Sequence, residues 1–285
     1  MKFSSLKPTL PRLQRSAVAL ALAAFGVGAS ALPVFTVDGD GTATAAQGVR
    51  ADNILISDFA RVFINSTNPS NVTFTESGYL TVTDFQLGGT TVMNSGVGSA
   101  YNMYVEFIGA GTLSSGTANP LTAPTFGQFT SLDYRLYSYG GPAATFGVDT
   151  AGAKLNGVLP NFTTTGVVGE VELARGSLID GTVSTSRGLG TEGKFSPTAS
   201  TLLTFNLTAA GQSVFTDPRP FYNAAFAAFT NNPSQVTLFD GGFGISQGGG
   251  SINFAAPIPE PETYALMLAG LAAVGFVARR RRPQA

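Results

Sequence analysis

The sequence predicts an all-β fold, an antiparallel β-sandwich or jelly-roll-like domain, on three observations. Residues 32–258 are rich in Gly, Thr, Ser, Ala and Phe and contain few Lys or Glu, so surface residues that favour helices are scarce. Short apolar or alternating runs recur between clusters of Gly, Asn and Pro, which is typical of strands joined by turns. No repeat of fixed period and no linker divides this region, and we therefore expect a single β-domain.

The expected strands follow one another along this domain. They lie at residues 53–64, 72–75, 79–85, 101–108, 131–139, 166–173, 201–207, 236–239 and 251–254. In the strand at 101–108, Met103, Val105 and Phe107 share one face. Tyr104 and Glu106 share the other face, so the two sets point to opposite sides of the sheet.

One segment of the domain departs from this pattern and predicts a helix. Residues 218–229 contain Pro220, and proline is favoured in the first turn of a helix. A helix that starts there would carry Tyr222, Phe226 and Phe229 on one face.

The composition excludes several classes of chemistry. The 285 residues include no His, no Cys and no Trp. Without His there is no Ser-His-Asp triad and no imidazole base, and without Cys there is no thiol nucleophile, disulfide or zinc finger. The absence of Trp also weakens a sugar-binding site built on tryptophan rings.

The charge is distributed unevenly along the chain. The net charge of the whole sequence is −1, but Lys2, Lys7, Arg12, Arg15 and the run 279–282 place half of the basic residues at the two ends. Residues 32–258 hold 8 basic and 15 acidic residues, a net charge of −7. Such an acidic body argues against nucleic acid as a partner, because phosphates require a basic surface.

Residues 1–31 have the pattern of a signal peptide. Positive charges precede an apolar stretch, and Ala29 and Ala31 supply the small side chains at positions −3 and −1 of a signal peptidase site. A short core helix is the alternative, but it would not account for all three features. We expect signal peptidase to cleave after Ala31.

Residues 259–285 form a tail of three parts. Pro259, Glu260 and Pro261 are followed by an apolar stretch at 263–278 and by the basic cluster Arg279, Arg280, Arg281 and Arg282. The 16 apolar residues would span about 24 Å as a helix, short of the roughly 30 Å hydrocarbon core. We expect a single transmembrane helix in a locally thinned bilayer, with the arginines in the cytoplasm and the acidic domain outside.

This tail resembles the PEP-CTERM sorting signal, in which a Pro-Glu-Pro motif, a short apolar helix and basic residues occur in this order. A plain single-span anchor is the alternative. The resemblance implies recognition by an exosortase, which is thought to cleave near the motif. The chain would then be a transient precursor anchored in the inner membrane and, after processing, a protein of the cell surface or extracellular matrix.

Parts of the domain resemble the flocculation-associated PEP-CTERM proteins. The resemblance rests on Arg-Ala-Asp-Asn-Ile at 50–54, the aromatic strand and Gly-Ala-Gly-Thr at 101–113, and Leu-Thr-Ala-Ala-Gly-Gln-Ser-Val-Phe-Thr-Asp-Pro-Arg-Pro-Phe-Tyr-Asn at 207–223. Asn53 stands where that family commonly has Lys, and residues 140–200 align with nothing in it. The resemblance implies an adhesive protein that is associated with exopolysaccharide and promotes floc or biofilm formation, and it brings no catalytic motif.

Two sets of residues are candidates for binding. Asp38 and Asp40, with glycines beside them, are the kind of oxygen ligands that Ca²⁺ prefers, although a solvated loop is the alternative and no other cofactor is expected. A sugar platform could be formed by tyrosine rings, and sheet packing with a wet hydroxyl is the alternative. The tyrosines concerned are Tyr101, Tyr104, Tyr134, Tyr137, Tyr139 and Tyr222.

These observations favour a non-catalytic structural or adhesive protein, with a glycosidase-like enzyme that remodels exopolysaccharide as the alternative. Glu170 and Glu172 would share one strand face about 7 Å apart, within the separation that glycoside hydrolysis requires. Asp180, Asp217 and Asp240 are the other carboxylates such an enzyme could use. Alternating acids on a solvent-facing strand are the commoner cause of this pattern.

Overall fold

Antiparallel strands make up nearly all of the structure, a computed structural model, as the sequence predicted. The structure describes residues 32–39, 48–68, 70–115, 125–148, 162–163, 168–185, 196–239 and 241–254. The predicted signal peptide and the predicted sorting tail with its transmembrane helix lie outside these residues. Within the described ranges, no helix has both the length and the apolar character needed to cross a membrane.

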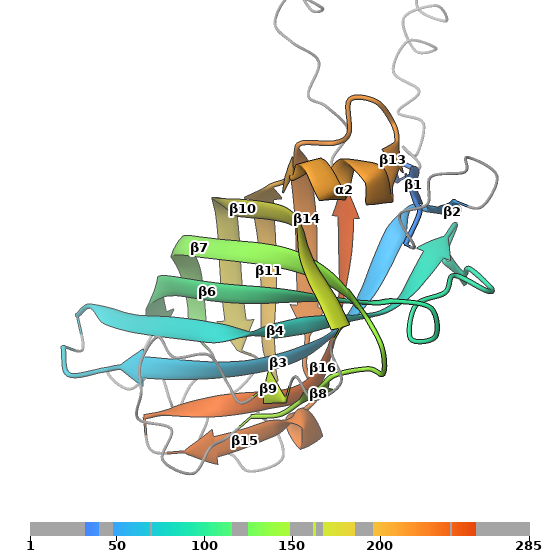
Figure 1. Cartoon of the computed structure of the whole chain (residues 1–285). Coiled ribbons are helices and arrows are strands. Elements are labelled where there is room, and N and C mark those ends of the chain that lie inside the picture. The colour runs from blue at the N-terminus through green and yellow to red at the C-terminus, as the bar shows by residue number, and fades with distance from the viewer. Residues whose placement is uncertain are drawn as a thin grey trace, which may run out of the picture. The chain divides into compact units, whose positions relative to one another are not determined.

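Eight long strands close into a barrel (Figure 1). They are β3 (Asn53–Asn65), β4 (Val72–Leu87), β6 (Asn102–Ser115), β7 (Thr125–Gly140), β10 (Val168–Thr185), β11 (Pro197–Thr204), β14 (Ala224–Thr230) and β16 (Gly242–Phe254). Their order is β11-β14-β16-β3-β4-β6-β7-β10, and pairing of β10 with β11 closes the circle. The predicted antiparallel sheet is therefore confirmed in its class, but one sheet closes on itself where two stacked sheets of a sandwich were expected.

Short elements surround the barrel. The strands β13 (Phe215–Asp217), β1 (Phe35–Val37) and β2 (Val49–Ala51) form a small second sheet, and β8 (Thr145–Phe146) pairs with β9 (Phe162–Thr163). Three further strands pair with barrel strands: β5 (Thr90–Thr91) with β4, β12 (Asn206–Leu207) with β10 and β15 (Val236–Phe239) with β16. The helical elements of the described residues are α2 (Ala209–Val214) and a 3₁₀ turn at Pro233–Gln235. Figure 1 shows β1, β2, β13 and α2 at the same end of the barrel.

The predicted strands at 72–75 and 79–85 are one continuous strand, β4. Gly78, which falls between the two predicted strands, lies inside β4 and packs tightly against β3. A Cβ atom at Gly78 would lie 2.5 Å from the carbonyl oxygen of Phe59. Gly78 thus permits a close approach of two backbones.

The predicted helix at 218–229 is wrong. Its second half is β14, a strand of the barrel wall between β11 and β16. Ala225 and Ala227 are buried while Phe226 is 42% exposed, so this segment follows the period of a strand. The helix of this region is α2, which begins after the N-cap residue Thr208.

One end of the barrel is filled by an aromatic cluster, which we call the aromatic cap. It consists of Phe35, Phe85, Phe205, Phe215, Phe221 and Phe254. The ring of Phe254 is central, with centroids 4.9 Å from Phe35, 4.8 Å from Phe205 and 5.0 Å from Phe221, all near edge-to-face. The cap joins the small sheet β13-β1-β2 to the barrel strands.

Candidate functional site

The outer face of the barrel carries a cluster of tyrosines on the neighbouring strands β4, β6 and β7. Even-numbered side chains of β6 point outward, and the register places Tyr104 opposite Tyr137 and Asn102 opposite Tyr139. Tyr79 of β4 lies beside them, opposite Glu106. We call Tyr79, Tyr104, Tyr137 and Tyr139, with Phe146 of β8, the tyrosine patch. It is a hydrophobic cluster separate from the interior core.

The rings of the tyrosine patch pack closely around Tyr104. The rings of Tyr104 and Tyr137 are stacked, with centroids 5.1 Å apart and an interplanar angle of 24°. Tyr79 and Tyr139 meet Tyr104 near edge-on, at 6.0 Å and 5.8 Å. Tyr79, Tyr104 and Tyr139 are buried, whereas Tyr137 is half-buried. Phe146 is half-buried as well, so the rings of Tyr137 and Phe146 form the accessible part of the patch.

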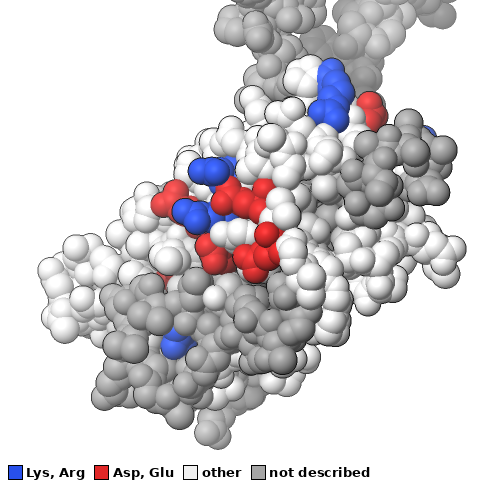
Figure 2. Space-filling view, in the orientation of Figure 1, with Lys and Arg blue, Asp and Glu red and all other residues white. Residues whose placement is uncertain are grey.

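Carboxylates and guanidinium groups surround the patch. The Tyr137 hydroxyl donates to Glu106 Oε1 at 3.3 Å, and the Tyr104 hydroxyl is hydrogen-bonded to Glu170. Arg135 lies opposite Glu106 in the β6–β7 register, and its pKa is raised chiefly by the neighbouring Tyr137. In the orientation of Figure 1, Figure 2 shows acidic and basic side chains gathered together in one region over these strands.

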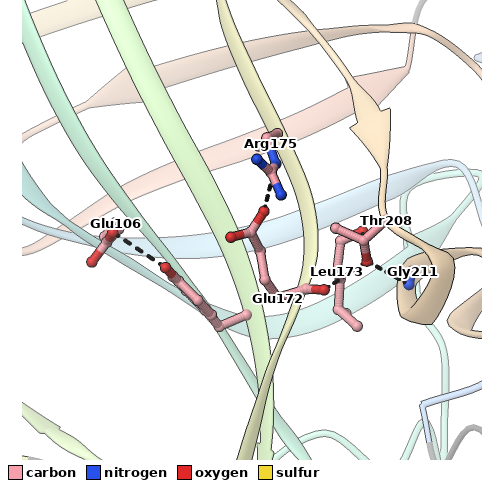
Figure 3. A network of polar contacts seen from close by, with 7 residues as sticks. Glu106, Glu172, Leu173, Arg175, Thr208 and Gly211 are labelled. Carbon is pink, nitrogen blue, oxygen red and sulfur yellow. Dashed lines mark hydrogen bonds and ion pairs between the residues drawn. The ribbon is translucent and has the colours of Figure 1, made fainter.

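A polar network joins this charged region to the helix α2 (Figure 3). Glu172 Oε1 lies 2.7 Å from Arg175 Nε, and because Arg175 is 63% exposed this ion pair adds little stability. The backbone carbonyl oxygen of Glu172 accepts a hydrogen bond from the Thr208 hydroxyl at 2.7 Å. The same hydroxyl accepts from the N–H of Gly211 at 3.0 Å, which caps the helix. The position of β10 next to the patch is thereby fixed.

Burial keeps the phenols of the patch protonated. Desolvation, and next to it the charge of Glu106, raises the pKa of Tyr79 to about 12. The pKa of Tyr104 is raised further, first by burial and then by the charge of Glu170. Burial also raises the pKa of Tyr139, whose hydroxyl oxygen accepts from the N–H of Ala144 at 2.9 Å. At neutral pH these phenols are uncharged and can donate hydrogen bonds.

This arrangement suits contact with a neutral polyhydroxylated molecule. The accessible ring of Tyr137 can cover an apolar sugar face, and carboxylates can accept hydrogen bonds from hydroxyl groups. The arginines supply donors at the edge of the same surface. The site lies on the outer face of three paired strands, and an extended outer surface suits a long polymer better than a small substrate.

The structure brings together three of the six predicted tyrosines: Tyr104, Tyr137 and Tyr139. The other three lie elsewhere and donate their hydroxyls to backbone carbonyl oxygens. Tyr101 donates to Ser95 at 3.0 Å, Tyr134 inside the barrel to Thr204 at 2.7 Å, and Tyr222 beside the aromatic cap to Val34 at 2.9 Å. Strand parity separates them, since Tyr134 lies an odd number of residues from both Tyr137 and Tyr139.

The predicted acidic pair Glu170 and Glu172 does lie on β10 at the tyrosine patch. Glu170 bonds Tyr104, and the charge of Glu172 acts on Tyr137. Val171, which lies between them in the sequence, is also 44% exposed, and the pairing with β7 is irregular here. The other candidate acids lie apart: Asp180 is exposed on β10, Asp217 is exposed on β13, and Asp240 lies outside the described residues.

Only one of the two predicted Ca²⁺ ligands, Asp38, lies within the described residues. Asp38 is buried at 6% exposure, and its N–H donates to the carbonyl oxygen of Val214 at 2.7 Å, while Asp40 lies outside the described residues. Among the side chains that the structure describes, no three acids gather in a way that could hold a metal ion. The predicted sorting and cleavage residues also lie outside the described part of the chain. They are Ala29, Ala31, Pro259, Glu260, Pro261, Arg279, Arg280, Arg281 and Arg282.

Sequence reasoning missed Tyr79, Glu106 and Arg135 as members of the site. The available signal was parity, because Glu106 and Tyr104 are two residues apart on one strand and therefore share a face. Which strands lie next to this face depends on the order of all the strands in the sheet. The contribution of Tyr79 could not be read from its own segment.

Comparison with protein families identifies the tail. The model of the PEP-CTERM protein-sorting motif matches residues 257–282, which overlap the predicted sorting signal. Comparisons with curated proteins and with solved structures give no significant match. The chain therefore carries a PEP-CTERM sorting motif, which implies exosortase-dependent export to a cell-surface or extracellular location.

Proposed function

We propose that the protein is a non-catalytic, adhesive component of the extracellular matrix that holds exopolysaccharide on the outer face of its barrel. The contact surface is the tyrosine patch with Glu106, Glu170 and Arg135. By binding polymer strands outside the cell, the protein promotes floc or biofilm formation, as the resemblance to flocculation-associated proteins implies.

The single observation that carries this proposal is the geometry around Tyr137. Its ring is stacked on Tyr104, and its hydroxyl is bonded to Glu106, so an accessible aromatic face is held rigidly beside a charged acceptor. Rigid presentation lowers the entropy lost on binding. The export implied by the sorting motif puts this surface where exopolysaccharide is found.

The distribution of titratable acids supports a binding role over glycoside hydrolysis. A glycosidase needs a carboxylic acid that stays protonated near neutral pH beside a second, ionised carboxylate. Burial raises the pKa of Glu76 to about 7 and that of Asp58 well above its usual range, but both side chains line the barrel interior. A polymer on the outer face would not reach them.

A polymer pull-down with the purified full-length chain tests the proposal. We expect Tyr137→Ala to reduce retention on purified exopolysaccharide by about tenfold, since one aromatic contact contributes on the order of 1 kcal/mol. The matched control is Phe126→Ala, which removes another exposed aromatic ring from β7, one that is 65% exposed. Equal losses in both variants, or no loss in either, would contradict a site at Tyr137.

A cellular assay and an activity assay separate adhesion from catalysis. Deleting the gene should abolish aggregation while polymer synthesis continues, and the Tyr137→Ala gene should fail to restore aggregation. Release of reducing ends from purified exopolysaccharide, lost in Glu170→Gln or Glu172→Gln, would replace the proposal with the glycosidase alternative. Normal flocs in the deletion strain would refute the adhesive role.

A further inference from the structure

An interior cavity of about 110 Å³ lies inside the barrel. Its wall is almost entirely apolar and includes Ile54, Val62, Leu80, Val105 and Phe129. The aromatic cap bounds it at one end, where Phe254 and Phe215 belong to the lining. Eight-stranded barrels have an interior that side chains either fill or leave open for one small ligand. Here the space is left open.

Two carboxylic acids of neighbouring strands, Asp58 on β3 and Glu76 on β4, face this apolar cavity. Asp58 is 3% exposed and interrupts a series of inward-facing apolar residues on β3. Glu76 pairs with Val62, which shares the cavity wall. Isolated buried charges are costly, and burial raises the pKa of both acids, with the charge of Glu76 acting on Asp58 as well.

Polar atoms in this wall lack partners. Asp58 Oδ1 and Thr201 Oγ1 are fully buried and form no hydrogen bond within the described part of the chain. Both residues line the cavity. A buried polar atom without a partner costs about 1–3 kcal/mol. Such atoms call for a hydrogen-bond partner from outside the protein, either water or a ligand.

Basic side chains of the described residues do not line the cavity beside the two acids. Arg61, three residues after Asp58, has the opposite strand parity, and its charge acts on Tyr79 of the outer patch. The remaining titratable group in the wall is Tyr134, whose hydroxyl already donates to the carbonyl oxygen of Thr204 at 2.7 Å.

We propose that the barrel interior is a binding site for a small organic cation, a protonated primary amine with a short apolar chain. The apolar wall would hold the chain, and Asp58 and Glu76 would hold the ammonium group. A metal ion suits the site less well, because hard cations require about six oxygen ligands and no three acidic side chains of the described residues gather here. The volume fits a ligand no larger than benzene, which an engineered cavity of about 150 Å³ accommodates.

Binding of n-butylammonium to the purified full-length chain tests this inference by titration calorimetry, with 1-butanol as the neutral probe and butyrate as the anionic probe. We expect butylammonium to bind at least about tenfold more tightly than butanol, and butyrate not to bind. At pH 6 the ammonium should drive ionisation of a carboxyl group that is otherwise protonated. About one proton should therefore be released, measured from the dependence of the heat on the ionisation enthalpy of the buffer.

Variants locate the site. Asp58→Asn with Glu76→Gln should weaken butylammonium binding at least about tenfold and abolish proton release, while butanol binding is retained. Glu76→Gln alone provides the same test if the double variant does not fold. Asp180→Asn, which removes an exposed carboxylate of β10, is the control and should bind like the unmodified chain. Equal binding of butylammonium and butanol without proton release, binding that survives both substitutions, or no binding at all would overturn the proposal.

Discussion

The interior of the barrel is filled by packed side chains at one end and contains a cavity beyond it. At one end, the aromatic cap fills the space with rings packed around Phe254. Beyond it, the same eight strands enclose a cavity of about 110 Å³ whose wall contains two acids. Close packing at the first end supplies stability, whereas the cavity gives up contacts and hydrogen bonds. The difference indicates that stability and binding are assigned to different parts of one barrel.

The largest effect should come from the packed end. Phe254→Ala removes the ring at the centre of the aromatic cap and should lower the free energy of unfolding by about 3–5 kcal/mol. Urea unfolding followed by circular dichroism measures this loss. Ile64→Ala, at a partly accessible position in the cavity wall, is the comparison and should cost less, since an open cavity already borders it. A larger loss of stability in Ile64→Ala than in Phe254→Ala would contradict the distinction between the packed end and the cavity.

The second expected effect is a dependence of the free energy of unfolding on pH, caused by Glu76 in the cavity wall. Burial raises the pKa of Glu76 from 4.5 to about 7, so between these values the folded chain holds a proton that the unfolded chain has released. Stability must therefore fall as the pH rises from about 4.5 through about 7. Glu76→Gln removes this contribution and should raise the free energy of unfolding at pH 8 by up to about 3 kcal/mol, with little change at pH 4. Unfolding curves of the two proteins that stay parallel from pH 4 to 8 would contradict a buried, protonated Glu76.

The smallest expected effect is the difference in stability between two Ala→Val substitutions, one at a packed position and one in the cavity wall. Ala51, opposite Phe35 in the small sheet, is completely buried, whereas Ala199 lines the cavity and is partly accessible. Ala51→Val should overpack its site and destabilise the fold by about 1–3 kcal/mol. Ala199→Val should add methyl groups to free space and change stability by less than about 1 kcal/mol. Thermal unfolding of the two variants measures the difference, and equal losses would mean that the interior is packed alike at both positions.

Local patterns were enough to predict the strands but not the closure of the sheet. Alternation at 101–108 placed Met103, Val105 and Phe107 on one face, and these residues do line the interior. A sandwich and a barrel share this alternation, so it could not distinguish them. The closing pair also depends on the length of β10, which contains Gly176 near its middle and the turn-like Asp180-Gly181 in its second half. There the sequence favours a turn, whereas pairing on both sides keeps the chain extended.

The candidate site could be predicted only in part, because alternation shows which residues of one strand share a face but not which strands are neighbours. Parity groups Tyr137 with Tyr139 and sets Tyr134 apart, but it does not reveal that β4 brings Tyr79 to the same surface. The interior acids had a local signal that was overlooked. Asp58 lies two residues from both Ile56 and Ala60, so a carboxyl group occupies the apolar face of its strand. A charged residue in the inward register of a core strand is a reason to look for a cavity.

The aromatic cap also brings the beginning and the end of the described domain together. Phe35 stands near the start of the described domain and Phe254 is its last described residue, yet their rings meet at 4.9 Å. Entry and exit of the domain therefore coincide at one pole of the barrel. A tether at either terminus would leave the opposite pole pointing away from the point of attachment. Force applied at both ends of the described domain would enter it at β1 and at Phe254, which is paired with Ala225 of β14.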